Sequence, residues 1–197
     1  MINLILWLAS ITLFRVEIDL IDILGLHYIE SGNFKLYQLL TYLFMHGNFS
    51  HIFFNMFAVF IFGRVLEETW GSKQFLIYYL MTGIGAGVIQ ECVWFFTLSP
   101  FFYDISLTIG ASGSVFGILL AFGMMFPNAP LYMMFIPVPI KAKYFVIAYG
   151  LIELYLGIVR FSGDNVAHFA HLGGMLFGYF FIRYRKKKAK SHGSYFQ

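Results

Sequence analysis

A serine enclosed by small residues is the first feature of this sequence that could do chemistry. It stands in the stretch Gly110-Ala111-Ser112-Gly113, directly before an apolar run that predicts a helix over 112–126. Small neighbours leave the hydroxyl open to approach, and the unpaired N–H groups of a beginning helix would point at the same place. These are the requirements of a nucleophile beside an oxyanion site. Taken alone, the four residues favour a simpler interpretation, a helix N-cap on a small-residue packing seam.

A histidine near the start of the last apolar run supplies a candidate base. His171 is followed by Gly174 and Gly178 on one helix face, and Gly113 and Gly117 have the same four-residue spacing. Two small-residue seams allow close helix contact, so we expect the imidazole to come within hydrogen-bond reach of the serine hydroxyl. The imidazole would then activate the serine for attack on a carbonyl and later protonate the leaving amine.

No acidic partner for this pair is apparent in the sequence. Asp164 falls in a predicted loop, and Glu153 falls in the middle of another predicted span. We therefore predict a catalytic dyad, Ser112 and His171, and not a triad.

Donors for an oxyanion are expected from the second predicted span. His51 and Asn55 are four residues apart and share one helix face, and an Asn amide is a neutral donor. Each of the two also fits a simple hydrogen bond between helices. Phe116 follows Ser112 by one turn and is placed to stack on the imidazole of His171.

A metal site is the other chemistry that the histidines suggest. The four candidates are His46, His51, His168 and His171. We predict no metal and no cofactor, because the last two have no nearby carboxylate ligand and the HExxH pattern is absent. His168 is then expected to orient or hydrate the site. A histidine-based metal or proton transporter is an alternative, but the intramembrane acids Glu91 and Glu153 do not cluster with the histidines in the sequence.

The elements that must position these residues are membrane helices. Apolar residues make up 59% of the chain and charged residues 12%, against about 25% charged residues in soluble domains. We predict an all-α, polytopic bundle of one domain (residues 1–184) with a basic cytoplasmic tail (185–197). Its six spans are predicted at 2–15, 49–67, 73–96, 112–126, 143–159 and 166–184. The long first loop, 16–46, is too polar to span and is expected to lie in the interface as short helices.

The distribution of positive charge predicts the orientation. With the basic tail inside, the inner side also holds Arg64, Lys73, Lys141 and Lys143, so both termini are predicted to be cytoplasmic. The second, fourth and sixth spans then begin on the outer side, where their polar residues can meet. The tail is read as a membrane contact and not as a nucleic-acid patch.

Several motifs in order resemble the rhomboid family of intramembrane serine proteases, over about residues 17–184. They are Thr41-Tyr42-Leu43-Phe44-Met45-His46, His51-Ile52-Phe53-Phe54-Asn55, Gly63 with Glu67 and Gly71, Gly110-Ala111-Ser112-Gly113, and Ala170-His171-Leu172-Gly173-Gly174. The resemblance implies Ser112 as nucleophile and His171 as base. It also implies an oxyanion site at His51 and Asn55, with Gly110 and Ala111 beside them.

The same resemblance implies the biological setting. The substrates would be transmembrane segments of other membrane proteins, cleaved near the extracytoplasmic side. The partners are then such substrates and the lipid bilayer, with no nucleic acid, and the minimal loops suit a bacterial inner membrane. The alternative is a non-catalytic rhomboid-like protein that binds transmembrane helices.

Two positions depart from the family pattern. Tyr37-Gln38 occupies the region of the first loop where members often have Trp-Arg, so a brace through an arginine is not expected. Phe116 stands where some members have tyrosine, which keeps ring stacking but removes a hydroxyl.

Overall fold

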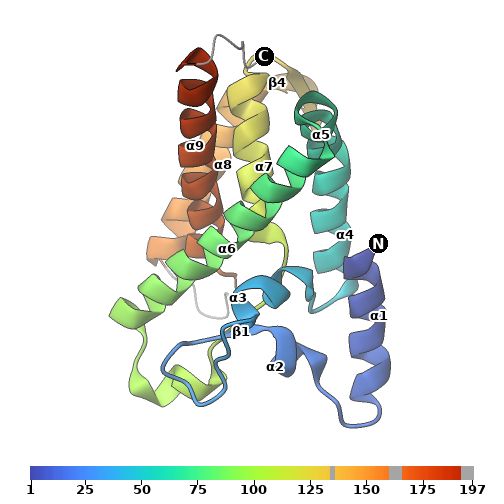
Figure 1. Cartoon of the computed structure of the whole chain (residues 1–197), viewed down its shortest axis with the longest axis vertical. Coiled ribbons are helices and arrows are strands. Elements are labelled where there is room, and N and C mark those ends of the chain that lie inside the picture. Colours follow the sequence, from blue (N-terminus) through green and yellow to red (C-terminus); the bar gives the residue numbers. More distant parts are fainter. Residues whose placement is uncertain (134–135, 160–165, 192–197) are drawn as a thin grey trace.

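The computed structural model describes residues 1–133, 136–159 and 166–191, and shows a bundle of apolar helices (Figure 1). The long elements are α1 (Ile2–Phe14), α4 (Phe49–Ala58), η2 (Val59–Gly63), α5 (Arg64–Trp70), α6 (Ser72–Thr97), α7 (Ser112–Met125), α8 (Ala142–Val159) and α9 (His168–Ser191). The π-helical turn η2 joins α4 and α5 into one continuous helix. Helix α6 crosses the front of the bundle diagonally and packs on α7 and α9.

The helices begin and end close to the residues predicted from the sequence, with one exception. Helix α4 starts after Asn48, whose side chain accepts a hydrogen bond of 2.8 Å from the His51 backbone N–H. Helix α5 ends at Gly71, which has a positive φ of 81° and turns the chain into α6. The last helix was predicted to end at residue 184 but continues to Ser191, so the first basic residues of the expected tail are helical.

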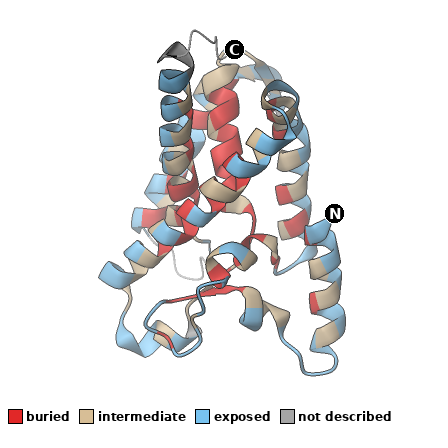
Figure 2. Cartoon of the chain, viewed as in Figure 1, coloured by how far each residue is buried: buried red, intermediate tan, exposed pale blue. Residues whose placement is uncertain are grey.

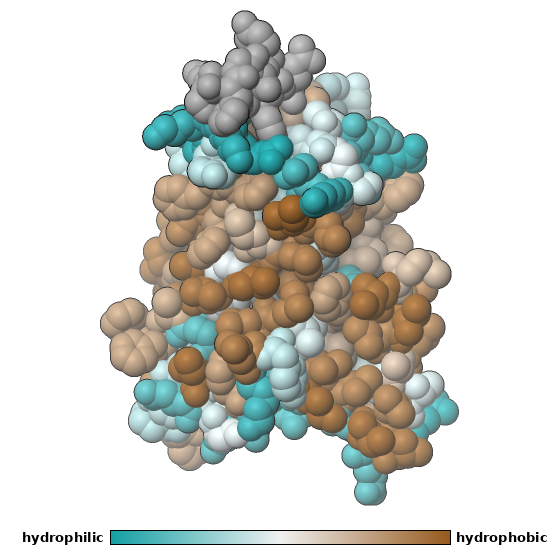
Figure 3. Space-filling model, in the orientation of Figure 1, coloured by the Kyte–Doolittle hydropathy of each residue, from teal (hydrophilic) through white to brown (hydrophobic). Residues whose placement is uncertain are grey.

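Three helices of the described chain are long and apolar enough to cross a membrane: Phe49–Trp70, Ser72–Thr97 and Ala142–Val159. Ile2–Phe14 and Ser112–Met125 are apolar but shorter. The face shown in Figure 3 has a hydrophobic band between hydrophilic ends, as expected for an integral membrane protein. The count of six spans stays a prediction.

Two short antiparallel ladders qualify the prediction of an all-α fold. Strand β1 (Leu26–His27) pairs with β2 (Leu107–Thr108), and β3 (Pro130–Met133) pairs with β4 (Ile136–Lys141). The second ladder occupies the proline-rich connection between α7 and α8. The first ladder ties the first loop to the segment that leads into Ser112.

The first loop contains the short helices α2 (Leu20–Leu24), α3 (Gln38–Thr41) and η1 (Tyr42–Phe44), as the sequence indicated. The side chain of Gln38 is 1% exposed and braces the loop from within. Its Oε1 accepts hydrogen bonds from the backbone N–H groups of Lys35 (2.9 Å) and His27 (3.4 Å), and its Nε2 donates to the carbonyls of Ile23 and Asn33. A neutral amide therefore braces the loop in the region where the family pattern often has an arginine.

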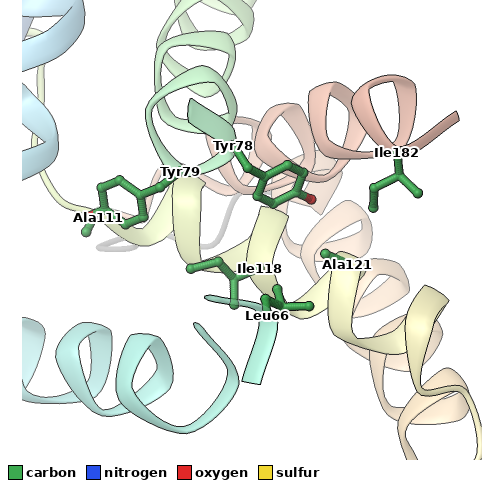
Figure 4. Packing of buried hydrophobic residues seen from close by; sticks show 7 residues of the cluster. All are labelled: Leu66, Tyr78, Tyr79, Ala111, Ile118, Ala121 and Ile182. Carbon is green, nitrogen blue, oxygen red and sulfur yellow. The ribbon is translucent and has the colours of Figure 1, made fainter. Parts of the chain in front are cut away.

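The core lies along α7, where buried residues follow one another for most of the helix (Figure 2). One cluster joins α7 to α5, α6 and α9, with Leu66, Tyr78, Tyr79, Ala111, Ile118, Ala121 and Ile182 as its members (Figure 4). Two hydroxyl groups in this core are paired across helices. The Tyr78 hydroxyl donates to the Gly117 carbonyl at 2.6 Å, and the Ser114 hydroxyl donates to the Tyr79 carbonyl at 2.7 Å. These bonds fix α7 against α6.

Candidate active site

The serine and the histidine singled out by the sequence lie side by side. Ser112 is the first residue of α7, and His171 lies in the first turn of α9. The Nε2 atom of His171 is 2.8 Å from the Oγ atom of Ser112. The imidazole is 8% exposed and the serine is half-buried, so the pair is sheltered but open on the hydroxyl side.

A direct backbone contact between α7 and α9 brings the pair together. A Cβ atom on Gly174 would fall on the carbonyl oxygen of Gly113, so only glycine allows this approach. The lower half of the predicted seam has a different partner, because Cβ atoms on Gly117 and Gly178 would point at α6 and not at one another. Both face α6, where Thr82 lies against each of them.

The prediction that no acid accompanies the histidine was wrong. Glu153, on α8, is 5% exposed, and its Oε2 atom is 2.8 Å from Nδ1 of His171. The same oxygen is 2.7 Å from Nδ1 of His168. Asp164, the other acid considered, lies outside the described residues.

Glu153 reaches the site because it lies on the packing face of α8. Gly150 and Gly157 flank it at three and four residues, and they contact Met175 and Phe169 of α9. Its other neighbours on the helix are exposed apolar residues: Leu151, Ile152, Leu154 and Tyr155. The spacing of the two glycines is the pattern in the sequence that could have predicted that Glu153 faces α9.

The distances favour one protonation pattern of the two rings, which holds for an ionised Glu153. An ionised carboxylate only accepts, so His168 and His171 each donate an Nδ1–H to Glu153. The Nε2 atom of His171 is then the unprotonated nitrogen, and it accepts a hydrogen bond from the Ser112 hydroxyl. This is the tautomer that a general base needs.

One face of the His171 imidazole is covered by aromatic rings. Phe116 lies parallel to the His171 ring, with 4.3 Å between centroids and 9° between planes. Tyr149 of α8 stacks on Phe116 in turn, at 5.0 Å. The ring of His171 is therefore held by a hydrogen bond at each nitrogen and by a stack on its face.

Gly110 shapes the approach to Ser112 from the other side. Its φ of 123° is a conformation that suits glycine, and its N–H donates to the Tyr42 carbonyl at 2.9 Å. A Cβ atom there would lie 2.5 Å from Nε2 of His51, so the imidazole of α4 packs directly on the Gly110 backbone. His46 meets His51 edge to face at 4.9 Å.

A cavity of about 750 Å³ opens over the serine. Four helices contribute its lining, which includes His51, Asn55, Ser112, Phe116, Tyr149 and His171. The Asn55 side chain donates one N–H to the His51 carbonyl at 2.8 Å, which orients the amide. The volume of the cavity lies within the range of sites that enclose small ligands or short peptide segments.

Comparison with known proteins identifies the family. A family model, the Rhomboid domain, matches residues 33–188. The chain belongs to the rhomboid family. It is 31% identical over 152 residues to "RHOMBOID-like protein 6, mitochondrial" of Arabidopsis thaliana, covering 77% of this chain and 44% of that protein. It is 30% identical over 148 residues to "Rhomboid protease GluP" of Bacillus subtilis, covering 73% and 25%.

A shorter relative of this rhomboid is "Putative rhomboid protease YdcA" of Bacillus subtilis, which is 26% identical over 163 residues. That match covers 81% of this chain and 73% of the relative. By contrast, the chain spans about half of the length of the plant relatives that it matches. The relatives include mitochondrial and chloroplastic proteins, so the bacterial inner membrane stays a prediction.

The argument made from the sequence against a metal in this rhomboid needs correction. A carboxylate does lie near the histidines, and the ligand atoms of Glu153, His168 and His171 are within 4.8 Å of one another. The oxygen-to-nitrogen distances of 2.7 and 2.8 Å are hydrogen-bond lengths. The two N–H donors and the carboxylate therefore satisfy one another directly, and the absence of a metal stays a prediction.

Proposed function

We propose that this rhomboid is an intramembrane serine endopeptidase that cleaves transmembrane segments of other membrane proteins near the extracytoplasmic side. Ser112 is the nucleophile and His171 is the general base. The observation that carries the proposal is the 2.8 Å contact between Nε2 of His171 and Oγ of Ser112 beside an open cavity. Relatives that are named rhomboid proteases support it.

The reaction follows from the protonation pattern of the pair. The Ser112 proton passes to Nε2 of His171 while Oγ bonds to the scissile carbonyl carbon. When the tetrahedral intermediate collapses, the C–N bond breaks and Nε2 returns the proton to the leaving amine. Water then attacks the acyl-enzyme by the same route and restores the serine.

Stabilisation of the oxyanion is assigned to groups around the start of α7. The first-turn N–H groups of a helix have no partners within the helix, and Ser112 stands at that position. His51 and Asn55 line the same cavity from α4. Loss of one such donor typically lowers the rate by about 10²–10³-fold.

The membrane setting suits a substrate that is itself a helix. Residues of α4 and α8 line the cavity, and both helices expose apolar side chains outside it. The basic end of α9 would lie in the cytoplasm and the first loop outside, with both termini inside. The serine would then act near the outer edge of the bilayer.

The test uses the purified protein in detergent or in liposomes with a model transmembrane substrate. Wild type should cleave it and should be labelled at Ser112 by a fluorophosphonate, whereas Ser112→Ala and His171→Ala should do neither. Undiminished cleavage by Ser112→Ala would overturn the proposal. A wild type that binds transmembrane helices but neither cleaves nor labels would favour the non-catalytic alternative.

A further inference from the structure

We infer that Glu153 is the positioning residue of the catalytic histidine, so that the site is a Ser112–His171–Glu153 triad whose carboxylate is shared with His168. This inference rests on the proposed function, since it concerns how His171 acts as a base. The observation is the single oxygen, Oε2, that lies 2.8 Å from one imidazole and 2.7 Å from the other.

Burial of the Glu153 carboxylate costs free energy, and helix packing alone does not account for it. Glu153 is 5% exposed in a helix whose outer surface is apolar, and an ionisable group in such a place is unfavourable unless it is paired. Contact between α8 and α9 does not need it, because Gly150 already packs on Met175 and Gly157 on Phe169. An apolar side chain at 153 would serve packing alone.

The carboxylate acts on the base in two ways. It accepts the Nδ1–H of His171, which keeps Nε2 free to take the serine proton. When that proton arrives, the imidazolium faces a negative charge across a hydrogen bond in a sheltered site. The favourable charge pair exists only after proton transfer, so it lowers the barrier of the chemical step without changing substrate binding.

His168 holds the carboxylate in place. It precedes His171 by one turn of α9 and donates to the same Oε2 atom, so the oxygen is fixed from two directions. The rings stand nearly perpendicular, at 86°, with 6.2 Å between centroids. His168, which the sequence analysis expected only to orient or hydrate the site, therefore acts on the serine indirectly, by fixing the carboxylate that orients His171.

The decisive variant is Glu153→Gln, with Glu91→Gln as its matched control. Glu91 is also a glutamate within an apolar helix, α6, but its carboxylate accepts from the Ile29 backbone N–H at 2.8 Å and takes no part in the site. Each is compared with wild type for kcat and KM on the model substrate, for the rate of fluorophosphonate labelling, and for the thermal midpoint.

We expect Glu153→Gln to lower kcat and the labelling rate together, by roughly 10²–10⁴-fold, as loss of the charge behind a catalytic histidine does elsewhere. KM and the thermal midpoint should stay near those of wild type. Glu153→Asp keeps the charge and should recover part of kcat, and His168→Gln should lower kcat less than Glu153→Gln. Glu91→Gln should behave as wild type.

Three results would overturn the inference. One is a Glu153→Gln protein with the kcat of wild type. Another is a loss that appears in KM or in the thermal midpoint while kcat holds, in both the Gln and the Asp variant, which would indicate a structural staple. The third is activity that a chelator abolishes and zinc restores, which would make the three side chains a metal site. Failure of wild type itself to cleave or label would instead refute the proposed function.

Discussion

Two regions of this molecule bury polar side chains, and they pair them in different ways. At the junction of α7, α8 and α9, side chains bond to other side chains: serine to histidine, and two histidines to Glu153. In the first loop and its contact with α6, side chains bond mainly to the backbone, although Nε2 of His27 also lies 3.2 Å from the Asp22 carboxylate. Gln38 bonds four main-chain groups, Glu91 accepts from an N–H, and Tyr42 donates to the Gly83 carbonyl at 2.7 Å.

The contrast separates groups that hold the fold from groups that move a proton. A main-chain amide or carbonyl does not titrate, so a side chain cannot pass a proton on through a bond to it. A chain of hydroxyl, imidazole and carboxylate can pass a proton from one end toward the other. Of the two intramembrane glutamates, Glu153 is therefore assigned to chemistry and Glu91 to structure, although their settings in the sequence look alike.

The strongest way to break this contrast is Gly174→Ala. The added methyl group would fall on the Gly113 carbonyl oxygen, and because that atom is backbone, the two helices must separate. We expect a loss of roughly 1–3 kcal/mol or more in stability and the loss of most cleavage, since a displacement of about 1 Å can cost on the order of 10²-fold in rate. The thermal midpoint and the labelling rate of Ser112 measure the two effects.

Gly32→Ala is the matched control for that experiment. No atom lies within 4 Å of the place where its Cβ would be, so this change should leave both measurements at the wild-type value. A Gly174→Ala protein that labels as fast as wild type would show that backbone contact between α7 and α9 does not position the serine and the histidine.

The helices were predictable because each is a long apolar run with local start and stop signals. Asn48 began one of the runs, and Gly71 ended it. The two short β ladders were not predictable in the same way, because a pair such as Leu26 and Thr108 joins segments far apart in the chain. Local pattern gives no register for such a contact.

The pairing of Ser112 with His171 was predictable from the spacing of small residues and the order of the motifs. Gly113 and Gly174 pointed to a close helix contact that exists, but the same reasoning paired Gly117 with Gly178, where α6 intervenes. Glu153 was missed because a lone acid in an apolar run does not reveal which face it occupies. That face is set by the packing of α8 on α9, which depends on glycines to either side of it.

A second prediction concerns the structural region. Gln38→Ala removes a buried amide and leaves the N–H groups of Lys35 and His27 without their acceptor, at a cost of roughly 1–3 kcal/mol. We expect a lower thermal midpoint with cleavage retained once the protein is folded. Gln74→Ala is the control, because that half-buried amide only accepts from Arg185 and should matter less. Loss of kcat at an unchanged midpoint would mean that the first loop takes part in the chemistry.

The smallest expected effect concerns the pH dependence of stability around His46, just before α4. Burial, and then the neighbouring His51, lower the pKa of His46 from 6.5 to about 4. Between these values the unfolded chain binds a proton that the folded chain does not, so this residue makes stability fall as pH drops from 6.5 toward 4. His46→Gln should therefore flatten the decline of the thermal midpoint over this window. A decline equal to that of wild type would show that the folded protein binds a proton at His46 as readily as the unfolded chain does, contrary to the lowered pKa.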